Sequence, residues 1–407
     1  MRKEYGNGYY EGEFNADGER HGEGTYYFED GKRYEGEWEY GNRHGKGKMF
    51  FPNGNFFDGE WKDNNRHGQG TLILYNGDRY EGSWVNGARE GYGKITFANG
   101  DSYDGSWVNG AREGYGKITF ANGDSYEGEW KNNVRHGKGV FCWADGDRYE
   151  GEFTDGKPNG YGIRYSSESY QKYEGMWKDG KRCGRGVITL ADGAVYDGEW
   201  LDDRWHGVGT LYFLNGDTYE GEFRNGNFEG HGIIYFNENE EIESEWKENK
   251  LHGHGVHYVD NKKIYEGEYK NDLRHGGCMA ILEDDVTFEG EYREGNLYHG
   301  ILYLGDNKYI GSFENNAFHG NGIFYWGNGD TYEGEFTSGE ITGNGVLTRG
   351  DVVYIGEVKN GLEHGHGTLY LPHGNKIEGD FVEGALDHSG KLYDANGNYV
   401  TDVVEKS

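Results

Sequence analysis

The sequence has few of the residues that stiffen or cross-link a chain. Only 3 of its 407 residues are proline and only 3 are cysteine. Collagen combines a Gly-X-Y period with abundant proline, so a collagen triple helix is excluded. Cys142, Cys183 and Cys278 stand far apart and make neither a disulfide framework nor a zinc-binding spacing. A reducing compartment fits this pattern, and we expect a cytoplasmic location.

Long apolar runs and an excess of basic residues are also missing. No run approaches the roughly 18 apolar residues of a membrane-spanning helix, and the first residues resemble no secretory signal. Lys and Arg number 41 against 72 Asp and Glu, which gives a net charge of −31. Nucleic acids and anionic membranes both attract clustered basic residues. We therefore expect no nucleic-acid partner and weak or no lipid binding.

Enzyme signatures are absent as well. The sequence contains no phosphate-binding G-x-x-x-x-G-K-[ST], no HExxH and no G-x-S-x-G. We therefore predict a protein without catalytic activity, cofactor or metal.

Glycine and aromatic residues, in contrast, are abundant. Glycine supplies 75 residues, and Tyr, Phe and Trp together supply 66. Flexible low-complexity segments are poor in aromatic residues, so disorder is not expected. Leu, Ile, Val and Met are too few for a conventional core of this length. Rings packed against glycine must supply the order, which is typical of a repeat architecture.

A motif of the form Tyr-acid-Gly-acid-aromatic recurs seventeen times. Twelve of the sixteen intervals are 23 residues long, and residues 82–103 are identical to 105–126. The repeats begin at Tyr10, Tyr34, Phe57, Tyr80, Tyr103, Tyr126, Tyr149, Tyr173, Tyr196, Tyr219, Ile242, Tyr265, Phe288, Tyr309, Tyr332, Tyr354 and Ile377. We expect an N-terminal cap at 1–9, one continuous array at 10–400 and a C-terminal tail at 401–407.

Each repeat is predicted to form two short strands. Residues 80–84 alternate, so Tyr80, Gly82 and Trp84 share one face. Asn-Gly and Asp-Gly pairs between the strands favour tight hairpin turns. Gly91 and Gly93 leave bare backbone beside the rings. The aromatic residues at the first and fifth positions should therefore form two ladders along the array.

The motif resembles the MORN (membrane occupation and recognition nexus) repeat, which is Tyr-x-Gly-x-Trp followed by His-Gly-x-Gly. The likeness is close at Tyr34-Glu35-Gly36-Glu37-Trp38 with His44-Gly45-Lys46-Gly47. The resemblance implies an all-β fold, an elongated single-layer antiparallel meander of β-hairpins with the form of a twisted rod or half-pipe. Ser244, Cys278 and Phe288 depart from the pattern, so we expect irregularity around residues 242–308.

Two columns of polar residues invite a chemical interpretation. Eleven histidines occupy one column, at His21, His44, His67, His136, His206, His252, His275, His299, His319, His364 and His388. Neighbouring members should lie roughly 10 Å apart, two strand spacings, so they cannot share one metal ion. We interpret them as partners of turn backbone. The acidic columns at positions two and four are interpreted as a solvated face.

The residue before the histidine column changes along the chain. We expect the arginines to form an edge for acidic partners or phosphate, and the apolar residues an edge for protein or self-association contacts. The arginine edge comprises Arg20, Arg43, Arg66, Arg89, Arg112, Arg135 and Arg182, with Arg274 as a later exception. The apolar edge comprises Trp205, Phe228, Leu251, Tyr298, Phe318 and Ile341. The alternative interpretation is structural: the arginines form ion pairs with carboxylates, and the apolar side chains pack under the turns.

Repeat arrays usually serve as extended binding surfaces. The family resemblance implies a non-catalytic scaffold that binds other proteins of a large cytoskeletal complex, with a homodimer left open. Repeat-only members that the chain resembles belong to radial spokes of ciliary or flagellar axonemes and to basal-body structures. The first alternative is an adaptor bound to membranes or phosphoinositides. A secreted glycan-binding or glycan-hydrolysing repeat protein is a more remote one.

Overall fold

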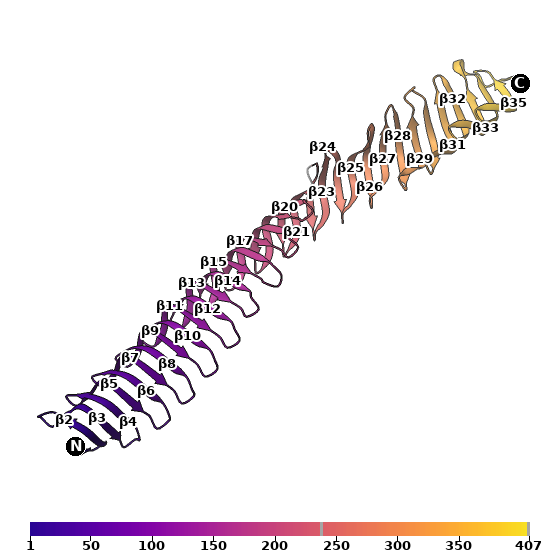
Figure 1. The fold of residues 1–407 in the computed structure, drawn as a ribbon. Helices are drawn as coiled ribbons and strands as arrows, with labels where there is room; N and C mark the ends of the chain where they lie inside the picture. Colours follow the sequence, from indigo (N-terminus) through magenta and orange to yellow (C-terminus); the bar gives the residue numbers. More distant parts are fainter. Residues whose placement is uncertain (237–238, 405–407) are drawn as a thin grey trace. The chain divides into compact units, whose positions relative to one another are not determined.

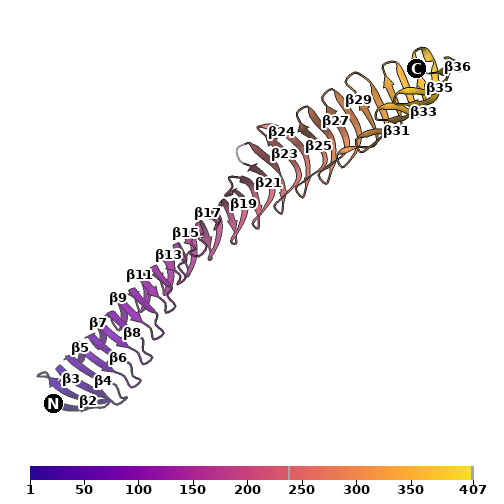
Figure 2. The same cartoon turned by 45° about the vertical axis from the view of Figure 1, so that its right-hand side comes forward.

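The computed structural model describes residues 1–236 and 239–404. It divides into two compact units, Met1–Trp205 and His206–Ser407, so the boundary falls within one strand of the array. Within each unit, successive strands pair antiparallel with their neighbours in the chain, as Figure 1 shows and the rotated view in Figure 2 confirms. The predicted all-β meander of tandem hairpins is therefore confirmed.

The strands of the first unit are short and regular. They are β1 (Arg2–Tyr5), β2 (Gly8–Phe14), β3 (Arg20–Phe28), β4 (Arg33–Glu39), β5 (Asn42–Phe50), β6 (Phe56–Lys62), β7 (Asn65–Ile73), β8 (Arg79–Val85), β9 (Ala88–Thr96), β10 (Ser102–Val108), β11 (Ala111–Thr119), β12 (Ser125–Lys131), β13 (Val134–Cys142), β14 (Arg148–Thr154), β15 (Lys157–Tyr165), β16 (Lys172–Lys178), β17 (Lys181–Thr189) and β18 (Val195–Leu201).

The second unit begins within β19, whose first two residues, Arg204 and Trp205, belong to the first unit. Its strands are β19 (Arg204–Tyr212), β20 (Thr218–Arg224), β21 (Asn227–Phe236), β22 (Glu240–Lys247), β23 (Lys250–Val259), β24 (Lys262–Lys270), β25 (Leu273–Glu283), β26 (Val286–Arg293), β27 (Asn296–Leu304), β28 (Asn307–Glu314), β29 (Ala317–Tyr325), β30 (Thr331–Thr337), β31 (Glu340–Arg349), β32 (Val352–Lys359), β33 (Leu362–Tyr370), β34 (Lys376–Val382), β35 (Ala385–Tyr393) and β36 (Tyr399–Val404), with one 3-10 turn at Pro372–Gly374.

The ends of the chain join the array. Strand β1 lies within the segment expected to cap the array and pairs with β2. Residues 401–404 of the expected C-terminal tail belong to β36, which pairs with β35. Residues 405–407 of that tail lie outside the described residues. The polar backbone of β1 and β36 is thus paired on one side only.

The aromatic residues form one interleaved column instead of two separate ladders. The ring of Tyr34 meets Trp38 of its own repeat at 5.1 Å and Trp61 of the next repeat at 5.2 Å, edge to face in both cases. The same alternation continues from Phe57 to Trp84. Edge-to-face contacts add about 0.5–1.5 kcal/mol each beyond the buried area. A single sheet layer can therefore bury its own core on one face, the ladder face.

Backbone carbonyls satisfy the polar atoms of the buried rings. The hydroxyl of Tyr80 donates to the carbonyl oxygen of Ser83 at 3.2 Å. The indole nitrogen of Trp84 donates to the carbonyl oxygen of Gly70 in the preceding repeat at 3.2 Å. A buried hydroxyl or indole N–H without a partner would cost free energy. These bonds fix each ring in register along the array.

Glycines sit where the ring column approaches the backbone. Gly82 pairs directly with Gly93 across the strands, and a methyl group at Gly93 would overlap the ring of Tyr80. The turn at Asn86 and Gly87 has φ of 50° and 87°, the left-handed pair that a two-residue hairpin requires. Glycine therefore has two separate roles, next to rings and in turns.

A bulge lies at the His-Gly pair in the regular repeats that carry it. Gly59 pairs with Gly70 and Glu60 with His67, so Gly68 and Gln69 bulge out of the ladder. Gly68 has φ of 58°. The carboxylate of Glu60 accepts a hydrogen bond from the amide of Gln69 at 3.1 Å. The acid at the fourth position, interpreted from the sequence only as a solvated charge, thus also caps the bulge.

The departures expected around residues 242–308 are accommodated by paired changes. Ile242 replaces the tyrosine of its repeat and lacks a hydroxyl, and buried Ser244 lies 3.4 and 3.3 Å from the carbonyl oxygens of His252 and His254. In a regular repeat, the hydroxyl of Tyr126 reaches the equivalent carbonyl of His136. The serine hydroxyl therefore takes over the role of the missing phenol.

A second paired change occurs at Cys278, which stands where the regular repeat has glycine and pairs with Gly267. Ala280, fully buried, stands opposite Tyr265 where Ile95 stands opposite Tyr80. A larger residue at one place is balanced by a smaller one two residues away. The packing of Tyr265 is thereby preserved, as expected for a core that conserves volume.

Candidate interaction surface

The seven arginines of the predicted edge lie on the ladder face, over the rings. Each follows a hairpin turn as an early residue of its strand, opposite the fifth-position aromatic residue, as Arg43 is opposite Trp38. Each guanidinium carbon is 4.4–4.9 Å from the centroid of a nearby ring, which is a cation–π distance. The arginine edge predicted from the sequence is therefore a row of guanidinium groups that cover the rings of the core.

Hydrogen bonds to turn carbonyl oxygens hold five of these guanidinium groups in place, those of Arg20, Arg43, Arg112, Arg135 and Arg182. Arg43 donates to the carbonyl oxygen of Asn64 at 2.8 Å, and Arg182 donates to that of Asp203 at 3.0 Å. Burial against the rings lowers the pKa of Arg43 and of Arg112 below the ordinary value. The arginines thus tie each repeat to the next, which agrees with a structural role. Each guanidinium still has donors beyond the one used here.

In the second half, apolar side chains take the place of the arginines. Phe228 stacks on Tyr219 with ring centroids 3.8 Å apart, and Phe318 stacks on Tyr309 at 4.1 Å. Trp205, the last residue of the first unit, stacks on Tyr196 at 4.6 Å. Leu251 is buried opposite Trp246. Arginine and aromatic residues thus cover the same tyrosine face by different interactions.

Tyr298 does not belong to this column. Leu297 pairs with Tyr292 and is buried, whereas Tyr298 is the bulged residue between Leu297 and His299. Counting back from His299 in the sequence assigned Tyr298 to the column, one residue too late. In this shortened repeat the bulge lies before the histidine, and not after it. The register also adds members that the sequence did not single out. Pro158, Glu363 and Leu386 occupy the same column, opposite Phe153, Val358 and Phe381.

Glu363 reverses the charge of the column. It is 7% exposed and pairs with Arg349, whose Nη1 lies 3.1 Å from both of its carboxylate oxygens. Arg349 also donates to the carbonyl oxygen of Gly361 at 2.8 Å. The guanidinium of Arg349 therefore lies near the turn at Gly361, although Arg349 belongs to β31 and the column residue Glu363 belongs to β33.

Two members of the predicted apolar edge meet in one groove of the second unit. This groove has a volume of about 530 Å³, and Phe318 and Ile341 line it. Leu304, Phe324, Trp326 and Phe336 complete its apolar walls, with Glu340 and Asn360 at its polar positions. Sequence reasoning missed Phe324 and Trp326. Their alternation after His319-Gly320-Asn321-Gly322 would have placed both on the ladder face.

The histidine column makes no metal site. In the described residues, no group of three or more His, Cys, Asp or Glu side chains could hold a metal ion. Nδ1 of His44 lies 3.3 Å from a carboxylate oxygen of Glu39. Nδ1 of His21, His67 and His252 is buried without a hydrogen-bond partner. The expected bond from the imidazole to turn backbone is therefore not seen at these three positions.

The repeats identify the family. The MORN repeat model matches fifteen segments: 10–33, 34–56, 57–79, 80–102, 103–125, 126–148, 149–168, 173–195, 196–218, 219–239, 243–262, 265–276, 309–331, 332–351 and 354–376. The chain belongs to the MORN repeat family. These MORN repeats make it an interaction or scaffold protein of the repeat type. The unmatched stretch 277–308 contains Cys278 and the shortened repeat at Phe288.

Comparison with other known proteins adds little. No curated protein matches the sequence. Among solved structures, the SAS-4 (dCPAP) TCP domain of Drosophila melanogaster, in complex with a proline-rich motif of Ana2 (dSTIL), is 14% identical. The alignment covers 36% of this chain and 78% of that one, with a TM-score of 0.24. The TCP10 domain of Danio rerio CPAP, in complex with a peptide of Danio rerio STIL, is 12% identical, with coverage of 60% and 98% and a TM-score of 0.19. At these scores neither likeness informs function.

Among the described residues, no helix has the length and the hydropathy needed to cross a membrane.

Proposed function

We propose that this chain is a non-catalytic scaffold that binds other proteins along its ladder face. The observation that carries the proposal is the groove at Phe318 and Ile341, where apolar side chains line a space of about 530 Å³. Apolar pockets with a few polar groups at the rim are typical contact points for partner side chains. A homodimer is one arrangement that this surface permits.

The cellular setting is proposed from the family resemblance. Repeat-only MORN proteins are components of cytoskeletal assemblies, so we propose a cytoplasmic protein of a ciliary or flagellar axoneme, of the radial-spoke kind, or of a basal body. A long array of similar binding positions suits such a structure, because neighbouring repeats can hold several partners at fixed spacing. Co-fractionation with salt-washed axonemes tests this setting. Recovery only in the soluble fraction would contradict it.

The experiment on the groove uses arginine as the substituent. Phe318→Arg and Ile341→Arg place at this column the residue that the first unit carries there, so each ring below stays covered. The matched control is Arg66→Phe, which makes the reverse exchange in the first unit. Proximity labelling in the native cell should lose a distinct set of proteins with the double variant and retain it with the control. An unchanged set with the double variant would overturn the role of the groove.

An adaptor that binds phosphoinositides is the second candidate, and the row of guanidinium groups favours it. These groups recur every second strand, about 10 Å apart, on one face. Sedimentation with vesicles containing 5% phosphatidylinositol bisphosphate would detect such binding, with plain phosphatidylcholine vesicles as the control. The net charge of −31 opposes it. Binding that persists in Arg43→Gln/Arg66→Gln/Arg112→Gln would exclude the arginine row as its cause.

A further inference from the structure

One repeat in the first unit departs from the others at three positions of the ladder face. Pro158 replaces the arginine of the column. Arg164 stands opposite Tyr149, where Phe141 stands opposite Tyr126. Ser166 opens the turn after β15, because its amide donates to the carbonyl of Gln171 as the amide of Trp143 does to Asp147.

The position of Ser166 is otherwise occupied by a large apolar side chain in the neighbouring repeats. Residues with the same turn hydrogen bond are Phe51, Leu74, Phe97, Phe120, Trp143, Leu190 and Phe213. Serine removes nearly all of that volume. Arg164 does not refill it, because its guanidinium lies 4.9 Å over the ring of Trp143 and bonds Asp147 at 3.1 Å in the preceding turn. The space that a large apolar side chain fills in the neighbouring repeats is therefore left open at Ser166.

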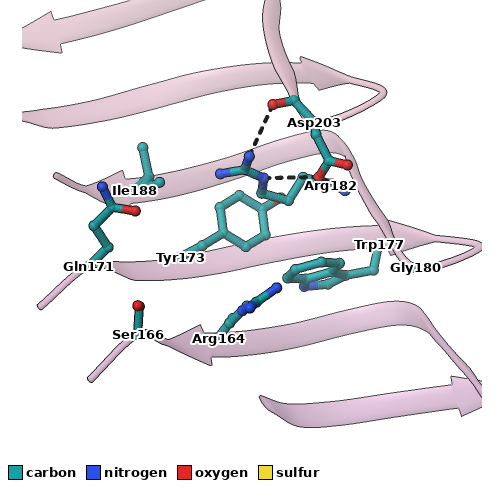
Figure 3. A pocket seen from close by; sticks show the side chains of 9 residues that line it. All are labelled: Arg164, Ser166, Gln171, Tyr173, Trp177, Gly180, Arg182, Ile188 and Asp203. Atoms are coloured by element: carbon teal, nitrogen blue, oxygen red, sulfur yellow. Dashed lines mark hydrogen bonds and ion pairs between the residues drawn. The ribbon is translucent and has the colours of Figure 1, made fainter. Parts of the chain in front are cut away.

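A cavity of about 400 Å³ lies at this place (Figure 3). Its walls are Tyr173, Trp177 and Ile188, with Ser166 and Gln171 at one end. Arg164 and Arg182 both line it, and Arg182 also bonds Asp203 at 3.1 Å. We call this cavity the Ser166 pocket. It thus combines buried rings with two guanidinium groups.

We propose that the Ser166 pocket receives one aromatic side chain of a partner protein, with an acidic group beside it. The inference rests on the proposed function, because it takes the partner to be a protein. The array itself supplies the template, since neighbouring repeats fill this place with Phe, Leu or Trp of their own chain. The guanidinium carbons of other arginines in this unit lie 4.4–4.9 Å from ring centroids, so Arg164 and Arg182 can flank an added ring in the same way.

The acidic group follows from the charges at the pocket. Asp203 is the single carboxylate among the lining residues, and it is already engaged by Arg182. Each guanidinium has five N–H donors, of which these pairs use only some. A carboxylate next to the entering ring would accept the remaining ones, and hydrogen bonds between charged groups are about twice as strong as neutral ones. An acidic aromatic segment therefore matches the site, and a basic one does not.

The indole N–H of Trp177 provides a reporter inside the pocket. It donates to the carbonyl oxygen of Gly162 at 3.1 Å, so its NMR resonance is held in a fixed environment. The probe is N-acetyl-tryptophan, which carries a ring and a carboxylate at pH 7, titrated into the full chain. The shift of the Trp177 resonance should be compared with those of Trp107 and Trp130, which follow the turns at Phe97 and Phe120 as Trp177 follows the turn at Ser166. Selective movement of the Trp177 resonance is the expected result.

Two further probes separate the parts of the proposal. N-acetyl-tryptophan amide keeps the ring without the carboxylate and should bind about fivefold more weakly, in line with one lost charge-assisted bond. N-acetyl-glycine keeps the carboxylate without a side chain to fill the pocket and should leave the Trp177 resonance unmoved at the same concentration. Equal movement of all indole resonances, or none at Trp177, would overturn the proposal.

Substitutions give the second test. Ser166→Phe restores the residue type of the neighbouring repeats and should abolish the titration while the other indole resonances stay in place. Arg164→Gln leaves the pocket open and should reduce the advantage of the acid over the amide, which keeps the proposal falsifiable if the phenylalanine variant folds poorly. Binding unchanged in both variants would refute the site. The proposed function fails by a different result, the absence of any protein partner of the wild-type chain in proximity labelling.

Discussion

The ring of Phe228 lies flat on the ring of Tyr219, with centroids 3.8 Å apart and planes inclined by 12°. In the first unit the guanidinium of Arg89 lies 4.9 Å over Tyr80 at the equivalent place. Phe228 and Arg89 thus have the same structural role, since each covers the face of a tyrosine ring in a single-layer sheet. They leave different surfaces above the core, apolar over Tyr219 and cationic over Tyr80.

This stack predicts a local loss of stability in Phe228→Ala. The variant exposes a face of Tyr219 and should cost about 2 kcal/mol, less than a fully buried phenylalanine because Phe228 is half-buried. Amide hydrogen exchange of β20 and β21 should accelerate about 30-fold, since repeats open locally. Phe228→Arg is the matched control and should recover most of the protection. Acceleration spread evenly over both units would contradict a local role.

The contact of Gly93 with Tyr80 predicts a steric penalty. Gly93→Ala places a methyl group in the ring and should destabilise the first unit by about 1–3 kcal/mol, the usual cost of overpacking. Gly277→Ala is the control, because a Cβ there meets nothing within 4 Å. Its free energy of unfolding, measured in urea, should stay within about 0.5 kcal/mol of the wild-type value. Equal losses in the two variants would show that backbone freedom, and not the ring, explains the effect.

The tyrosine column predicts weaker folding at alkaline pH. Burial raises the pKa of Tyr80 and of Tyr103 to about 12 from an ordinary value of 10.0. The contribution of these two tyrosines to the free energy of unfolding is complete below pH 10. It is lost as the pH rises from 10 toward 12, because the unfolded state then releases protons that the folded state retains. Urea midpoints measured between pH 8 and 11.5 should therefore fall above pH 10.

Tyr80→Phe/Tyr103→Phe supplies the control for that prediction. Phe57 shows that the column accepts phenylalanine. The double variant loses the bonds to Ser83 and Ser106 and should be less stable at pH 8 by about 1 kcal/mol for each bond. Its decline above pH 10 should be shallower than in the wild-type chain. A parallel decline would assign the alkaline loss to other groups.

Cys278 is predicted to be an unreactive thiol in the folded chain. Burial raises its pKa to about 11, so roughly 1 in 1000 molecules carries the thiolate at pH 8. In Cys142→Ser/Cys183→Ser, reaction with a disulfide reagent should be about 100-fold slower in buffer than in 8 M urea. Rapid modification of the folded chain would contradict this burial.

The repeat period alone identified the strands, the turns and the face that each ring occupies. Tyr80, Gly82 and Trp84 alternate, and strand geometry allows only one arrangement of that alternation. The exchange of arginine for apolar residues after residue 182 is likewise visible in the sequence, and so are the departures at Ser244 and Cys278. Such features are local, because each depends on spacing within about one repeat.

The tertiary structure decided where those side chains go. Arg43 and its equivalents could point away from the sheet or over it, and only the position of the following turn shows that they cover the rings. The bulge in the shortened repeat placed Leu297, not Tyr298, in the column. The Ser166 pocket depends on β15, β16 and β17 together, since a missing side chain becomes a cavity only when the strands beside it are held in register by their own rings and hydrogen bonds.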